Sequence, residues 1–200
     1  MIIKEPKVVA KKKSYMVVLQ GIGGMLQNQP PDMGPEKASK QKQTKENLHA
    51  NELNNWKDKL YLNGDDVIQR SEAIHQCIQD GASYWGAKIP GEGMKKYANI
   101  VKCGLLVEDG SFGIKKDDPS IMPFGKACNP TPTKGAGGKV YKVRPMINPW
   151  ELTFVMHVFD TGRLTKDVLL TILTYSGTYI GLSDWRPTYG RFNVVEFDEV

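Results

Sequence analysis

Two adjacent aspartates are the first residues in this sequence whose type and spacing could do chemistry. Asp65 and Asp66 follow a glycine, and a pair of carboxylates at the end of a strand can hold a catalytic magnesium ion. Such a site needs a third acidic ligand on a neighbouring strand, where residues 150–159 offer only Glu151. Asn63-Gly64-Asp65 has the composition of a hairpin turn, which is the favoured interpretation. A metal-dependent nuclease or cyclase is therefore supported by Asp65 and Asp66 alone.

The histidines and cysteines form no pattern typical of a metal site or a nucleophilic triad. They are widely separated along the chain: His49, His75 and His157, and Cys77, Cys103 and Cys128. Three cysteines at this spacing predict no disulfide framework, so we expect reduced thiols, with Cys77 in the core. The sequence predicts no metal, no cofactor and no enzymatic activity.

Two glycine-rich segments resemble phosphate-binding loops but lack their context. Gly21-Ile22-Gly23-Gly24 follows a predicted strand, but Pro30-Pro31 stands where a dinucleotide site requires a helix. Residues 134–139 (Lys-Gly-Ala-Gly-Gly-Lys) lead into Val140 and a strand, whereas a P-loop requires Ser or Thr and then a helix. We therefore expect a flexible exit from the first strand, and a mobile basic loop at 134–139 that can lie along a phosphate backbone.

Basic and aromatic side chains are interleaved near the loops and strand ends of the C-terminal half. Single-stranded nucleic acid needs cations for its phosphates and flat side chains on which its bases stack. The predicted nucleic-acid-binding residues are Lys134, Lys139, Lys142, Arg144, Trp185, Arg186, Tyr189 and Arg191. A structural interpretation stays open, in which the two aromatic residues close the core and the loop arginines pair with Asp184 or Glu196. Arg144 is likewise expected either to bind phosphate or to pair with a carboxylate inside the fold.

Charge is unevenly distributed over a chain of ordinary globular composition. The 200 residues carry 27 Lys and Arg against 22 Asp and Glu, but residues 1–45 hold nine Lys and three acids. This excess, together with a second basic stretch at 126–144, favours a polyanionic partner, and solubility is the alternative explanation. The sequence has neither an 18-residue apolar run nor an apolar N-terminal segment. We therefore expect no membrane span, no secretory signal and a cytoplasmic location, in the host cell if the protein is viral.

Hydrophobic periodicity predicts the elements that must position these side chains. Strands are expected at 14–21, 104–107, 139–147, 150–159 and 191–197, and helices at 45–57, 72–86 and 165–180. Strands 139–147 and 150–159 are predicted to pair as a hairpin across Asn148-Pro149, and residues 59–69 to form a smaller hairpin. Residues 22–45 are expected to be a flexible loop and residues 87–138 an irregular insertion.

The strongest of these elements follow one another in the order βαββαβ. This order is typical of an α+β fold of the ferredoxin-like or RRM-like type, in which two helices cover one face of a four-stranded antiparallel sheet. The two long insertions then follow the first strand and the first helix. We expect one domain over residues 1–200, with a basic N-terminal arm at 1–13. Such a fold fixes no function by itself.

The C-terminal half carries a recognisable set of motifs. They are Arg144-Pro145, Trp150 with its alternating strand, the helical segment 169–180, Gly181-Leu182-Ser183-Asp184-Trp185-Arg186-Pro187 and Tyr189-Gly190-Arg191-Phe192. With Gly21 and Leu60-Tyr61, this set resembles a family of uncharacterised phage and prophage proteins, over most of the chain apart from residues 25–45. The glycine-rich segment that follows the last helix is also similar to the RAMP superfamily, whose RRM-like subunits coat guide RNA in CRISPR effectors.

These resemblances imply binding rather than turnover. They give Arg144, Trp185, Arg186, Tyr189 and Arg191 as family-typical positions. We therefore predict a non-enzymatic protein of phage origin that binds single-stranded DNA or RNA and forms a homo-oligomer along the strand. The alternative is a phage inhibitor or mimic that binds a host defence complex of the CRISPR type.

Overall fold

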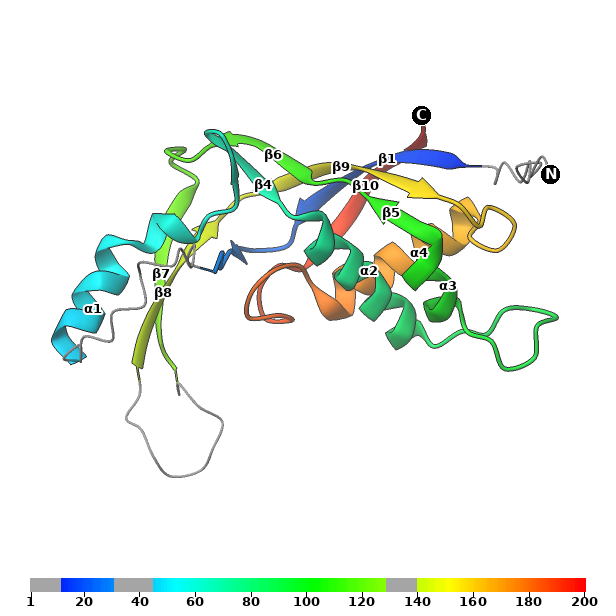
Figure 1. Cartoon of the computed structure of the whole chain (residues 1–200), viewed down its shortest axis with the longest axis horizontal. Coiled ribbons are helices and arrows are strands. Elements are labelled where there is room, and N and C mark those ends of the chain that lie inside the picture. Colours follow the sequence, from blue (N-terminus) through cyan, green and yellow to red (C-terminus); the bar gives the residue numbers. More distant parts are fainter. Residues whose placement is uncertain (1–11, 31–44, 129–139) are drawn as a thin grey trace, which may run out of the picture.

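The computed structural model describes residues 12–30, 45–128 and 140–200, which form an α+β fold built on two antiparallel sheets. In Figure 1, helices α2, α3 and α4 lie on one side of the larger sheet, and the smaller sheet extends away from it. Within the described ranges, no helix is long and apolar enough to cross a membrane. The predicted α+β class is confirmed.

The larger sheet has seven strands, where the sequence predicted four. Their order is β10-β1-β9-β6-β4-β3, and β5 also pairs with β9. The bounds are β1 (Lys13–Gly21), β3 (Leu62–Asn63), β4 (Asp66–Gln69), β5 (Leu105–Val107), β6 (Gly110–Lys115), β9 (Glu151–Val158) and β10 (Phe192–Glu199). The added strands come from residues 59–69, where the predicted hairpin is confirmed, and from the region expected to be an irregular insertion.

The core lies between this sheet and three helices, α2 (Ser71–Trp85), α3 (Tyr97–Gly104) and α4 (Lys166–Tyr175). Alternate residues of β9 are buried against the helices, from Leu152 to Val158. Helix α2 begins one residue earlier than predicted, because the Asp109 carboxylate accepts the Ser71 N–H at 2.7 Å. It ends as predicted at Gly86, whose φ of 68° favours glycine. Helix α4 is capped by Thr165, whose side chain accepts a hydrogen bond from the Val168 N–H.

The smaller sheet has the order β2-β8-β7, with β2 (Met25–Leu26), β7 (Ile121–Cys128) and β8 (Val140–Ile147). Helix α1 (Lys45–Asn54) and the short 3₁₀ helix η1 (Trp56–Lys59) contact β8. Residues 22–30, expected to be part of a flexible loop, contain β2 and the buried Gln27. The described part of the expected irregular insertion, residues 87–128, contains α3, β5, β6 and β7 and is therefore largely regular.

The predicted hairpin between 139–147 and 150–159 is wrong. β8 pairs with β7 and β2, whereas β9 pairs with β1, so the chain passes from one sheet to the other at Asn148-Pro149. Both strands carry a pattern suited to pairing, but their partners are distant in sequence, which a local pattern cannot reveal. The place beside β9 that the prediction gave to residues 139–147 is taken by β5.

Candidate nucleic-acid interface

Strands β7 and β8 bring aromatic and basic side chains to one face of a long hairpin. Phe124 lies opposite Arg144 and Lys126 opposite Lys142, and directly opposed residues of an antiparallel pair share a face. The loop formed by residues 181–191 joins this face, because the Asp184 N–H donates to the Leu26 carbonyl at 2.9 Å. The smaller sheet and this loop therefore position the candidate site.

An aromatic–cation cluster forms where the loop meets the hairpin, and consists of Phe124, Lys126, Arg144, Trp185 and Tyr189. The Phe124 ring lies 6.0 Å from the Trp185 ring and 5.3 Å from the Tyr189 ring, between centroids. Lys126 Nζ and Arg144 Cζ lie 5.7 and 5.8 Å from the centroid of the Trp185 ring, within cation–π range. The three rings are half-buried, so each retains surface for a ligand.

The backbone around Trp185 is held in an uncommon conformation. Its φ is 53° and that of Ser183 is 67°, in the left-handed region that bulky residues rarely adopt. The Asp184 carboxylate accepts the Trp185 N–H at 3.0 Å, and the Gly190 N–H donates to Gly24 at 3.0 Å. Strain of this kind persists where surrounding contacts enforce it, and it concentrates at functional sites.

Arg144 takes the structural alternative that the sequence left open. Its Nε donates to Asp184 Oδ2 at 2.8 Å, and its side chain is only 12% exposed. The guanidinium therefore ties β8 to the 181–191 loop and orients the Trp185 ring. The prediction of Arg144 as a phosphate anchor is corrected accordingly, because a carboxylate already offsets its charge.

Lys142 is likewise bound within the fold, to Glu52 of α1. The Glu52 carboxylate accepts from Lys142 Nζ at 2.8 Å, from the Val143 N–H at 3.0 Å and from Lys59 Nζ. Burial raises the pKa of Glu52, but these three hydrogen bonds outweigh it and bring the pKa to about 2. Lys59 Nζ also donates to the Val143 carbonyl at 2.7 Å, so two side chains satisfy the backbone of β8 at this edge.

The remaining loop residues are more available to a ligand. Arg186 Nη1 lies 3.4 Å from the Asp80 carboxylate, and Arg191 Nε donates to the Pro187 carbonyl at 2.9 Å. Both arginines are exposed, and the charge of Arg191 meets a neutral acceptor. In the structural interpretation of the sequence, Asp184 or Glu196 was the expected partner of these two arginines. In the structure Arg186 contacts Asp80 and Arg191 contacts the Pro187 carbonyl instead. Lys134 and Lys139 lie outside the described residues.

Of the paired aspartates, Asp65 lies in the turn of the β3–β4 hairpin and Asp66 begins β4. Lys116 Nζ lies 2.7 Å from Asp65, and Lys115 Nζ lies 2.6 Å from Asp66. The hydrogen bond from Lys116 lowers the pKa of Asp65 below its usual range. Among the described residues, no three His, Cys, Asp or Glu side chains gather in a metal-binding group.

The uncovered face of the larger sheet is acidic. Cross-strand register places Glu151, Glu196 and Asp198 on one face of the sheet, and Glu108 joins them through its contact with His157. Helices α2, α3 and α4 lie on the other side of the sheet (Figure 1). Apolar side chains lie between them, including the 55% exposed Leu106. His157 Nε2 lies 2.8 Å from Glu108, and Lys166 Nζ lies 3.6 Å from Asp198. This face and the aromatic–cation cluster thus differ in chemistry.

Sequence reasoning gave no site role to Phe124 or Glu52, placed Lys126 only in the basic stretch 126–144, and offered Asp184 to the loop arginines and not to Arg144. Phe124 and Lys126 lie in a strand that was not predicted, and their pairing with β8 has no local signal. Glu52 and Asp184 were not recognised as the partners of Lys142 and Arg144, which are 90 and 40 residues away. The sequence signal for this site is the basic and aromatic composition of residues 185–191, which identified two of the three rings, Trp185 and Tyr189.

No family model and no curated protein matches this chain. A search of solved structures gives similarity to a chain of the Type III-B Cmr-beta complex, solved by cryo-electron microscopy bound to cognate target RNA. The TM-score is 0.54 at 14% sequence identity, and the match covers 95% of this chain. It covers 61% of the other chain, so this protein spans about three fifths of that length. At this identity the similarity concerns the fold.

Proposed function

We propose that this protein binds single-stranded nucleic acid, without turnover, on the face formed by the β7–β8 hairpin and the 181–191 loop. The observation that carries the proposal is the aromatic–cation cluster. Its three half-buried rings lie 5.3 to 6.4 Å apart between centroids, and Lys126 and Arg144 lie 5.7 and 5.8 Å from the Trp185 ring. The rings offer stacking surfaces to bases, which are accessible only in single strands. A fold similar to that of a chain in an RNA-bound complex supports the proposal.

The residues in this proposal have separate roles. Trp185 and Tyr189 stack on bases, with Phe124 as their support. Lys126 and Arg191 contact phosphates. Arg186, Lys134 and Lys139 are proposed to add long-range attraction, and Lys142 and Arg144 hold the hairpin and loop in place.

The carboxylates of the uncovered sheet face support this location. In a ferredoxin-like domain, which we propose for the unit β1-α2-β5-β9-α4-β10, the uncovered face is the obvious surface for a ligand. Here that face carries Glu108, Glu151, Glu196 and Asp198, which repel phosphates. Nucleic acid is therefore expected at the hairpin side. Phage origin and assembly into a homo-oligomer along the strand are further parts of the proposal.

Fluorescence anisotropy with labelled 30-nucleotide RNA and DNA tests the proposal. We expect binding of single strands that weakens steeply with salt, and much weaker binding of a duplex. Removing Lys126 and Arg191 together is expected to flatten the plot of log affinity against log salt by about 1.4 units, since each phosphate contact on a single strand contributes about 0.7. Replacing Lys88 and Lys102, two exposed lysines away from the site, is the matched control.

Trp185→Leu separates stacking from charge. Loss of one stacked base is expected to weaken binding tenfold or more while leaving the salt slope unchanged. Circular dichroism melting checks that the loop still folds. Absence of binding to any single strand at low salt, or an equal effect of the control lysines, would sink the proposal.

A second candidate function is association with a multisubunit nucleoprotein complex, as the inhibitor or mimic considered from the sequence. The similarity to a chain of such a complex favours it. A pull-down with purified complex, before and after nuclease treatment, distinguishes the two functions. If this protein still retains the complex after nuclease treatment and has no affinity for isolated single strands, the second function is favoured.

A further inference from the structure

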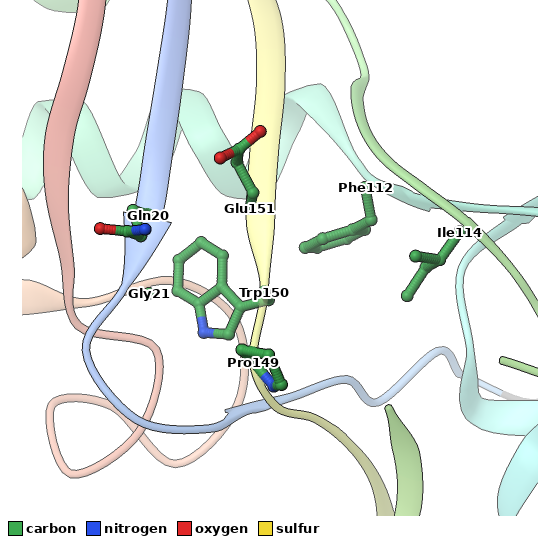
Figure 2. Close-up of a pocket in the computed structure, with 7 residues that line it drawn as sticks. All are labelled: Gln20, Gly21, Phe112, Ile114, Pro149, Trp150 and Glu151. Atoms are coloured by element: carbon green, nitrogen blue, oxygen red, sulfur yellow. The ribbon is translucent and has the colours of Figure 1, made fainter. Parts of the chain in front are cut away.

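A cavity of about 380 Å³ opens where the larger sheet separates from the smaller one (Figure 2). β6 pairs with β9 only at Ser111 and Thr153, so the two strands diverge beyond that point. The walls are apolar, formed by Phe112, Ile114, Pro149 and Trp150, and the polar lining residues are Gln20 and Glu151. No residue of the aromatic–cation cluster lines this cavity.

The apolar part of the cavity is rigid. Trp150 Nε1 donates to the Gly23 carbonyl at 3.0 Å, and the Phe112 ring meets the Trp150 ring edge-on at 6.3 Å. The indole lies against Gly21, where a Cβ atom would overlap the ring. The cavity is therefore formed before any ligand arrives, which lowers the entropic cost of binding.

The polar part combines a carboxylate with a carboxamide. Gln20 and Glu151 are cross-strand partners on β1 and β9, and Figure 2 shows both beside the Trp150 ring. Both side chains are exposed, and no ion pair among the described residues involves Glu151. The pair presents three acceptor oxygens next to an apolar wall, which fits a planar group that carries several N–H donors.

We propose that this cavity binds the arginine side chain of a protein partner. The guanidinium would donate two parallel hydrogen bonds to Glu151 and a third to the Gln20 carbonyl, while the methylene groups pack on Ile114 and Pro149. Arginine suits an apolar wall better than lysine, because its delocalised charge is more weakly hydrated. A guanine base has similar donors, but its phosphates would approach the carboxylates of the same sheet face, which favours a protein partner.

Nuclear magnetic resonance on the ¹⁵N-labelled full chain tests the inference, with the Trp150 indole N–H as the reporter. The probes are N-acetyl-arginine methylamide, its lysine counterpart and guanosine monophosphate. We expect a saturable shift with the arginine probe at up to about 20 mM, a range suited to so small a ligand, and binding at least fivefold weaker with the lysine probe. Glu151→Gln should abolish the shift, whereas Glu196→Gln, on the same face, should preserve it.

Three results would overturn the inference: no shift with any probe, an arginine shift that survives in Glu151→Gln, or a saturable shift with guanosine monophosphate alone. The last would identify a nucleobase cavity. Affinity for single-stranded nucleic acid should not fall in Glu151→Gln, because Glu151 lies outside the proposed nucleic-acid face and its charge repels phosphates. The cavity and the proposed nucleic-acid face can therefore fail independently.

Discussion

Replacing Glu52 by glutamine should loosen the β7–β8 hairpin by removing one carboxylate. Glu52 accepts hydrogen bonds from Lys142, from Lys59 and from the Val143 N–H, so one side chain connects α1, η1 and the edge of β8. Glutamine keeps the shape but offers no charge. Lys59, whose side chain is 18% exposed, would then be left without its counter-ion.

The pKa of Glu52 sets the magnitude of this effect. A fall from 4.5 to about 2 corresponds to about 3 kcal/mol at neutral pH. Because the cluster lies near the surface, water screens part of this energy, and we expect about 1–2 kcal/mol. The folded pKa is depressed, so the stabilisation is complete above pH 4.5 and is lost as the pH falls through about 2.

Amide hydrogen exchange over β8 measures this opening directly. At pH 7 the protection of the amides of residues 141–144 should fall about 5- to 30-fold in Glu52→Gln, which is the equivalent of about 1–2 kcal/mol. In the unmodified protein, protection corrected for the intrinsic rate should decline between pH 4.5 and 2, and in the variant this decline should be smaller. Glu196→Gln is the control, because Glu196 is exposed on another strand. Unchanged protection at pH 7, or the full decline in the variant, would refute the reasoning.

The other two predictions concern a glycine and the thiols. Gly190→Ala should lower the free energy of unfolding in urea by more than about 2 kcal/mol, because φ is 75° and a Cβ would overlap the Leu182 carbonyl. Gly162→Ala is the control: it has open space around it and should change the free energy of unfolding by no more than about 0.5 kcal/mol. Equal losses in the two variants would contradict this. Two thiols should react rapidly with an aromatic disulfide reagent at pH 8, while burial, which raises the pKa of Cys77 to about 12, protects the third. Rapid reaction of three thiols in the folded protein would contradict the buried position of Cys77.

The elements that could be predicted from sequence carry their own local signals. β9 alternates between buried and less buried residues, α2 ends at a left-handed glycine, and α4 begins at a capping threonine. The smaller sheet could not be predicted, because β7 contains Pro123 and Gly125 and lacks a clear alternation. Its partner β8 was recognised as a strand but was assigned to the nearest strand in sequence, which belongs to the other sheet.

The candidate site was predictable in composition but not in the role of each residue. The aromatic rings of 185–191 were singled out because they stand among arginines. Whether a basic residue faces a ligand or an internal carboxylate depends on residues far away in sequence. Arg144 pairs with Asp184 and Lys142 pairs with Glu52, and these two pairings became visible only in the folded chain.

The glycine-rich segment after β1 has a packing role that explains why it imitates a phosphate-binding loop. Glycines permit close approach, and here the approaching groups belong to the protein itself. The Trp150 ring lies against Gly21, and a Cβ at Gly24 would come within 2.6 Å of the Met146 sulfur. The carbonyls of this segment accept from Trp150 on one side and from Gly190 on the other, at 3.0 Å each. The segment thus joins the floor of the cavity to the loop that carries the rings. The N–H groups of Gly21 and Ile22, the kind of donor that cradles a phosphate, donate instead to the carbonyls of Trp150 and Arg191 at 3.0 and 2.7 Å.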